Sequence, residues 1–227
     1  GTTYYYQLSN NGKAGQIYSF TTGGDGELFS DISFLVSAGD QVNNASDETQ
    51  YDGYLEHNAL FGLPVATAIG NHDSSSNAYG QHFNIANESD EYGVTSAGGD
   101  YYFVYNNTLF LVLNSNAQSE EDVNGHKAFI QAAVETTKDR NITWKVAVFH
   151  HTLFTVASHA HDDYIDNANG FKNLIIPILE EFDIDAVLTG HDHVYCRTYI
   201  MDGTEPITEF DGYEYGNGTD AAPTAVN

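Results

Sequence analysis

Residues 65–73 read VATAIGNHD, and this stretch decides the fold. Its first five residues are apolar or β-branched, as in a buried strand, and the strand ends at a glycine followed by Asn71, His72 and Asp73. Asn, His and Asp bind divalent metals, and a glycine beside them lets the backbone approach such a site closely. The sequence therefore indicates a strand that carries polar ligands at its carboxyl end.

Three further apolar runs end in the same way. They are residues 32–38 before Gly39-Asp40, residues 144–149 before His150-His151, and residues 186–189 before Gly190-His191-Asp192-His193. Short apolar strands of this kind, alternating with helices, indicate an α/β fold built on a central sheet. In such sheets the ligand site lies beyond the carboxyl ends of the strands, so we expect the four polar clusters to converge on one cleft.

The intervening segments predict the remaining elements. Apolar periodicity predicts helices over 47–61, 127–137 and 174–182, and β-rich runs predict an antiparallel pair of strands over 101–105 and 109–114. Residues 1–22 predict two strands joined by a turn at 10–12, a pattern that resembles the last hairpin of a fibronectin type III-like domain. Residues 23–30 then predict a glycine-rich linker.

The chain is strongly acidic. Its 227 residues contain 7 Lys and Arg against 32 Asp and Glu, which gives a formal net charge of −25. Such a surface repels nucleic acid duplexes and anionic membranes, so nucleic acid binding is disfavoured. An anionic substrate would need a local positive centre, which bound metal ions can supply. Cys196 is the single cysteine, which excludes an intramolecular disulfide, and the lack of a long apolar run predicts no transmembrane segment.

The four clusters together resemble the motifs of the calcineurin-like metallophosphoesterases, and residues 190–197, GHDHVYCR, are similar to the purple acid phosphatase branch. The resemblance covers roughly residues 31–200. It implies a metallophosphoesterase domain over 31–227, with its C-terminal limit left open, in which a β-sandwich is flanked by helices in αββα layers. It also implies a dinuclear centre of Fe, Zn or Mn that hydrolyses phosphate esters through a metal-activated water attacking phosphorus.

The resemblance implies metal ligands one position at a time. Asp40 matches the carboxylate that bridges the two ions. Asn71, His150 and His191 match ligands of the second ion, and His193 matches a ligand of the first. We prefer His150 over His151 because it directly follows the apolar run.

The same resemblance implies catalytic and substrate-binding residues. His72 matches a residue that stabilises the phosphoryl charge and protonates the leaving group, and Asp73 is expected to hold its ring. His159 or His161 matches a histidine that faces the substrate. No role is assigned to the remaining histidines of the helices and the surface: His57, His82 and His126.

The family's first motif, Asp-x-His or Asp-x-Gly, has no counterpart in the sequence. Asp25 stands in the glycine linker, too close to the strand at 32–38 to leave room for a strand and a crossover. Either a segment is missing at the abrupt junction near Phe29-Ser30, which predicts a spatial break within 24–31, or the motif is truly deleted. In the second case the first ion keeps only Asp40 and His193.

Two hypotheses about function follow. The first is an enzyme that hydrolyses a small phosphate ester such as a nucleotide, with monoester and diester both open. The fibronectin-like hairpin places such an enzyme outside the cell or on the cell surface, as in a secreted bacterial protein. The second is a catalytically weak, metal-binding surface module that uses the phosphoesterase fold. The number of bound metal ions discriminates between the two, whereas oligomeric state is left open.

Overall fold

The computed structural model describes residues 3–10, 13–21, 32–56, 63–210 and 213–214. The strands are β1 Thr3–Asn10, β2 Lys13–Thr21, β3 Leu35–Ser37, β4 Val65–Thr67, β5 Tyr101–Tyr105, β6 Thr108–Val112, β7 Trp144–Val148, β8 Ala186–Leu188, β9 Met201–Asp202, β10 Glu205–Pro206, β11 Glu209–Phe210 and β12 Tyr213–Glu214. The helices are α1 Glu48–Leu55, α2 Ala78–His82, α3 Glu120–Thr137, α4 Asp163–Asp166 and α5 Phe171–Glu181.

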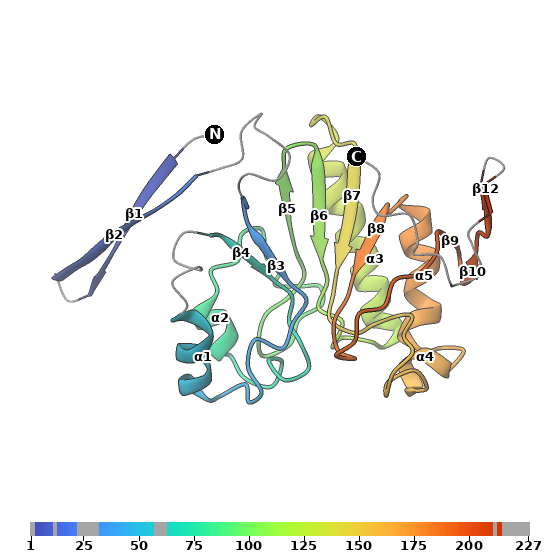
Figure 1. The fold of residues 1–227 in the computed structure, drawn as a ribbon, viewed down its shortest axis with the longest axis horizontal. Coiled ribbons are helices and arrows are strands. Elements are labelled where there is room, and N and C mark those ends of the chain that lie inside the picture. The colour runs from blue at the N-terminus through green and yellow to red at the C-terminus, as the bar shows by residue number, and fades with distance from the viewer. Residues whose placement is uncertain (1–2, 11–12, 22–31, 57–62, 211–212, 215–227) are drawn as a thin grey trace.

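The main sheet has the order β5-β6-β7-β8, in which β5 and β6 are antiparallel and β6, β7 and β8 are parallel (Figure 1). Strands β3 and β4 form a separate parallel pair. Helices α3 and α5 lie beside the main sheet, whereas α1 and α2 lie next to β3 and β4. The structure is thus a mixed α/β fold with a parallel-mixed sheet flanked by helices, as the sequence predicts.

Side chains that alternate along the central strands form two hydrophobic cores. In β6, Leu109 and Leu111 belong to one core with α3 and α5, and Phe110 and Val112 belong to the other. The second core also contains Val36 of β3 and residues near the end of β4. Because successive strand side chains point to opposite faces, the helices pack on one face of the main sheet and β3 and β4 pack on the other.

The predicted elements are present, with shifted ends. Strands β3, β4, β7 and β8 are shorter than predicted, because β3 begins at Leu35 and because apolar residues such as Ala68, Ile69 and Phe149 lie just beyond the strand ends. Helix α3 begins seven residues before the predicted 127, since Ser119 and Asp122 form a capping box that satisfies its first N–H groups. The short helices α2 and α4 were not predicted from the sequence.

The N-terminal hairpin is confirmed. Strands β1 and β2 pair from Thr3 with Thr21 to Asn10 with Lys13, and among the described strands they pair with each other alone. Its assignment to a fibronectin type III-like domain rests on the sequence pattern alone and stays a prediction. The predicted break within 24–31 and the end of the predicted helix at 57–61 lie outside the described residues. Within the described part of the chain, no helix combines the length and apolar character needed to cross a membrane.

His126 of α3 is fully buried. Its Nδ1 lies 2.6 Å from Oδ2 of Asp100 and its Nε2 lies 3.0 Å from the carbonyl oxygen of Ala117. Both partners are acceptors, so both ring nitrogens donate and the ring carries a positive charge. Burial lowers the pKa of His126, but the charge and hydrogen bond of Asp100 outweigh burial and raise it. The pair joins α3 to the residue that precedes β5.

Replacing His126 with Gln is expected to destabilise the protein by about 3–5 kcal/mol, because Asp100 is left buried without its charged partner. Because the pKa of His126 is higher in the folded than in the unfolded state, its charged pair contributes fully to the free energy of unfolding below about pH 6.5. This contribution is lost as pH rises through the folded-state pKa. The difference in unfolding free energy between wild type and His126→Gln, measured in urea, should therefore shrink from pH 6 to pH 9. His161→Gln is the control, since its side chain is 89% exposed. A difference that stays constant over this range would contradict a charged His126.

Candidate metal centre

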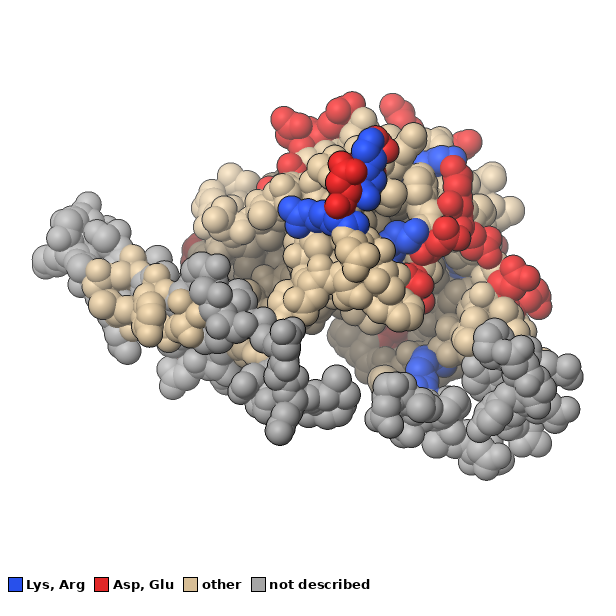
Figure 2. Space-filling view, turned by 90° about the horizontal axis from the view of Figure 1, so that it is seen from above, with Lys and Arg blue, Asp and Glu red and all other residues tan. Residues whose placement is uncertain are grey.

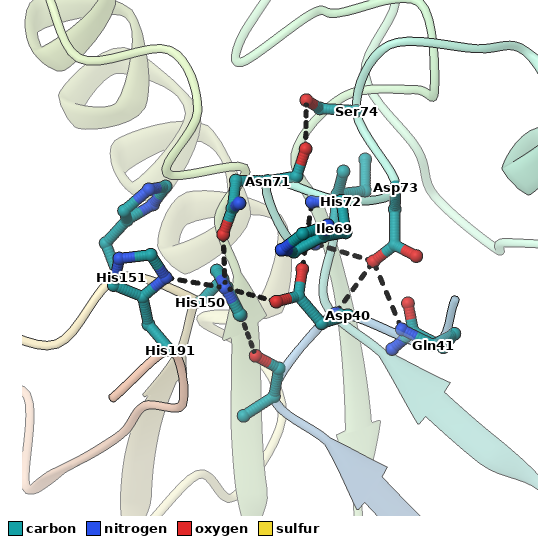
Figure 3. A network of polar contacts seen from close by, with 12 residues as sticks. Asp40, Gln41, Ile69, Asn71, His72, Asp73, Ser74, His150, His151 and His191 are labelled. Atoms are coloured by element: carbon teal, nitrogen blue, oxygen red, sulfur yellow. Dashed lines mark hydrogen bonds and ion pairs between the residues drawn. The ribbon is translucent and has the colours of Figure 1, made fainter. Parts of the chain in front are cut away.

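The four polar clusters converge at one end of the two sheets, as predicted (Figure 3). Asp40 follows β3, Asn71 follows β4, His150 follows β7 and His191 follows β8. Each of these strands is parallel to its partner in the sheet, so each pair brings its carboxyl ends to the same edge. Gly39 and Gly70 leave so little room between the loops that a Cβ on Gly39 would lie 2.4 Å from Nδ1 of His150.

Acceptor atoms surround Nε2 of His150. The Nδ1 of this ring donates to the carbonyl oxygen of Ala38 at 2.7 Å, which in a neutral ring leaves Nε2 without a hydrogen. Nε2 lies 3.0 Å from Oδ1 of Asn71, 3.1 Å from Nδ1 of His191 and 3.3 Å from Oδ2 of Asp40. A cation placed among this lone pair and the three atoms that face it would satisfy all of them.

This donor set fits a metal ion. Ligand atoms at about 2.0–2.2 Å from one ion are roughly 3.0–3.4 Å apart, which is the spacing found around Nε2 of His150. Asp40, His150 and His191 each offer an atom within 4.8 Å of the other two. Mixed imidazole, carboxylate and amide ligands suit Zn, Fe or Mn. Asp40, Asn71, His150 and His191 are therefore the residues that could hold one ion.

Two imidazoles of the site, those of His151 and His191, have a lowered pKa. Burial, followed by the charges of His150 and His159, lowers the pKa of His191 to about 4. Burial, followed by the charges of His150 and His191, lowers the pKa of His151 to about 3. His151 is held by Ser115, whose Oγ lies 2.9 Å from its Nδ1, and it belongs to neither group of potential ligands. This geometry agrees with the choice of His150 over His151.

Asp73 is fully buried and joins the two loops that carry Asp40 and Asn71. Its Oδ2 accepts backbone N–H groups from Asp40 and Gly70 at 2.8 Å each and from Gln41 at 3.4 Å, and its Oδ1 accepts the N–H of Val42 at 3.3 Å. Burial raises the pKa of Asp73, and the N–H donors of Gly70 and Val42 oppose that rise.

The predicted role of Asp73 is wrong in geometry. The ring of His72 bonds instead to the carbonyl oxygen of Asn43, 2.9 Å from its Nδ1, because the Asp73 carboxylate is turned inward toward backbone N–H groups. The backbone N–H of His72 donates to Oδ1 of Asp40 at 3.0 Å. His72 is exposed, and with Nδ1 donating to Asn43 its Nε2 is available to a ligand.

Three of the candidate ligands have a left-handed backbone. The φ angles are +56° at Asp40, +75° at His191 and +51° at His193. Non-glycine residues in this region are strained, and such residues cluster at functional sites. His193 lines a hollow of about 520 Å³ together with Asp40, His150 and His191, but it joins neither group of converging ligand atoms. The structure thus brings His193 to the same hollow without completing a first-ion site from the described residues.

The structure separates the two candidate substrate-facing histidines. The ring of His159 lies against that of His191, with centroids 4.1 Å apart. The side chain of His161 is 89% exposed and bonds to Asp166. His159 therefore lies at the site and His161 points into solvent. Sequence analysis missed two residues here, Asp162 and Asp192, of which Asp192 was identifiable as a carboxylate between two candidate ligands.

Gly70→Ala is expected to weaken metal binding at least tenfold and to destabilise the chain by about 1–3 kcal/mol, because the new Cβ would lie 2.0 Å from Oδ1 and 2.2 Å from N of Asp40. Gly53→Ala in α1 is the control, since its Cβ meets nothing within 4 Å and Ala favours the helix by about 1 kcal/mol. Metal titration and urea unfolding check both variants. Equal metal affinity in Gly70→Ala and wild type would show that this contact does not shape the site.

Comparisons with known proteins agree with this geometry. The profile of the calcineurin-like phosphoesterases matches residues 15–195. Purple acid phosphatase 7 of Arabidopsis thaliana is 25% identical over 204 residues, 79% of this chain and 58% of that protein. Purple acid phosphatase 4 of the same plant is 23% identical over 199 residues, 78% of this chain and 56% of that protein. The chain thus spans little more than half the length of these relatives. Because the family profile covers most of the sequence and its strand-end motifs meet in one place, the chain belongs to the calcineurin-like phosphoesterase family.

Proposed function

We propose that the chain hydrolyses small phosphate esters at a dinuclear metal centre built on Asp40. The observation that carries this proposal is the convergence of acceptor atoms on Nε2 of His150 at the carboxyl ends of four strands. Membership of a phosphoesterase family and the resemblance to purple acid phosphatases support the same reaction class. We also propose that this chain has the complete αββα layers of such enzymes.

Asp40, Asn71, His150 and His191 would hold one ion, and Asp40 with His193 would contribute to the other. Two bound ions supply Lewis acidity and lower the pKa of a water molecule near phosphorus. The protein contributes by holding the ligand side chains at a spacing that suits a metal ion before the ion binds. Burial raises the pKa of Asp40, but the neighbouring imidazole of His150 and the backbone N–H of His72 outweigh burial and lower the pKa, which favours the carboxylate.

His72 is the residue we assign to the reacting phosphate ester. Its Nδ1 donates to the Asn43 carbonyl, so Nε2 is the atom that faces the ester, and from the imidazolium form it would donate to a phosphoryl oxygen or give its proton to the leaving group. The N–H of His72 on Asp40 keeps the imidazole on the same loop as the proposed bridging carboxylate. His159, which lies against His191, can reach the substrate from the other side of that ring.

The charge distribution favours a small substrate. Acidic side chains stand out on the face in Figure 2, and basic ones lie close to acidic ones. Three of the basic residues, Lys127, Lys138 and Lys145, are paired with carboxylates. A nucleic acid duplex needs a continuous basic surface, so a small phosphate ester such as a nucleotide is the substrate class that we propose. We also propose that the protein acts outside the cell or on the cell surface, and that the hairpin is part of a fibronectin-like domain.

The second candidate function is a catalytically weak metal-binding module. The observation that favours it is that His193 joins no group of converging ligands among the described residues. An enzyme of the proposed kind should bind two ions at the centre built on Asp40, whereas such a module would bind one ion there and turn over slowly.

The test measures hydrolysis of an aryl phosphate monoester and the matching diester with added Mn, Zn or Fe. His72→Ala is expected to lower kcat by about 10²–10⁴-fold with unchanged metal content, because it removes a proton donor and no ligand. Asn71→Ala is expected to lose metal affinity as well as turnover. His82→Ala is the control, since His82 pairs with Glu48 at the junction of α1 and α2. Turnover that is equal in all variants, or absent with every metal, would refute the proposed reaction.

A further inference from the structure

A second group of metal-binding side chains lies beside the first. His159, Asp162 and His191 each offer a ligand atom within 4.8 Å of the other two. Nδ1 of His159 lies 2.7 Å from Oδ2 of Asp162, and the His159 ring packs against His191. His191 thus belongs to two groups, one with Asp40 and His150 and one with His159 and Asp162.

A buried carboxylate holds this second group in place. Asp192, the residue after His191, is 6% exposed. It accepts hydrogen bonds from the hydroxyl of Thr155, from the hydroxyl of Ser158 at 3.0 Å and from the backbone N–H of His159 at 3.1 Å. The loop that carries His159 is therefore bound to the same turn that carries His191. The two imidazoles are positioned relative to each other by backbone and buried contacts rather than by chance encounter of mobile side chains.

The chemistry of the group suits a borderline divalent cation. Two imidazoles and one carboxylate are typical ligands of Zn²⁺ or Co²⁺, whereas Mg²⁺ and Ca²⁺ prefer oxygen alone. The side chains of His159 and Asp162 are 36% and 39% exposed, so water or another ligand can enter. Residues 146–171 contain three Asp and no Lys or Arg, which favours a cation over an anion at this loop.

We propose that His159, Asp162 and His191 bind a further divalent cation, in addition to the ion held by Asp40, Asn71 and His150. Nδ1 of His191 faces His150, so Nε2 is the nitrogen left for the further cation, and its proton passes to solvent on binding. With three protein ligands the cation keeps an open position, which takes an anionic group such as phosphate. The binding of this cation does not depend on the chain being a hydrolase.

The same loop contains a matched control. His161 and Asp166 form a second His–Asp pair, with 3.1 Å between Nδ1 and Oδ2, and their side chains are 89% and 56% exposed. Among the described residues, no third side chain joins this pair in a group of potential ligands. Comparing the two pairs therefore separates a built site from the general attraction of cations to an acidic loop.

The experiment titrates the metal-free full chain with Zn²⁺ and with Co²⁺ and counts bound equivalents by equilibrium dialysis and elemental analysis. His159→Ala and Asp162→Asn are each expected to bind one equivalent fewer than wild type, or to bind it at least tenfold more weakly. His161→Ala and Asp166→Asn are expected to bind as wild type. Asp40→Asn should lose a different equivalent and keep the one that His159→Ala removes. Circular dichroism confirms that each variant is folded.

Folded His159→Ala and Asp162→Asn that bind as many equivalents as wild type, with the same affinity, would overturn the proposal and leave the His159–Asp162 pair as a proton-holding pair. An equal loss in His161→Ala would overturn it too, because binding would then be unspecific. The readout is bound metal rather than turnover. A wild type that binds the further equivalent but hydrolyses no ester would therefore count against the proposed function alone.

Discussion

The buried carboxylate of Asp73 is the contact on which the site depends. It accepts four backbone N–H groups, three from the turn after β3 and one from the turn after β4. A buried N–H left without a partner costs about 1–3 kcal/mol, so no uncharged apolar side chain could replace this group. Because both turns are bound to one carboxylate, Asp40 and Asn71 keep a fixed separation although they are far apart in sequence.

The sheets supply the rigidity that this arrangement needs. Left-handed backbone at Asp40 and His191 costs about 1–2 kcal/mol per residue, and the acceptor atoms around His150 repel one another. The alternating side chains of β6 and β7 pack on both faces of the main sheet and resist relaxation of the strand ends. A cation bound at His150 would remove the repulsion, and it would stabilise the folded state to the extent that it binds the folded chain more tightly than the unfolded one.

The negative charge of the chain and the proposed metal centre have opposite effects on the electrostatic potential at the site. A net charge of −25 would repel a phosphate ester, whereas cations at the proposed centre would reverse the sign of the potential there. Asp192 holds the His159 loop against the turn that carries His191, and Asp162 binds the ring of His159 within that loop. The imidazoles of His151 and His191 stay neutral at physiological pH, because burial and the charges of neighbouring histidines lower their pKa.

Local patterns predict the α/β class and the strands that end in polar side chains, because an apolar run followed by Gly, Asp, Asn or His can be read along the chain. The choice of Asp40, Asn71, His150 and His191 as candidate ligands rests also on the resemblance to the phosphoesterase family. The partners of these residues follow from tertiary contacts alone. Asn43 rather than Asp73 orients His72, His126 is a buried charged residue, and His159 rather than His161 lies at the site. These facts depend on which loop lies against which other loop, and contacts between residues 26 or more positions apart leave no periodic signal along the chain.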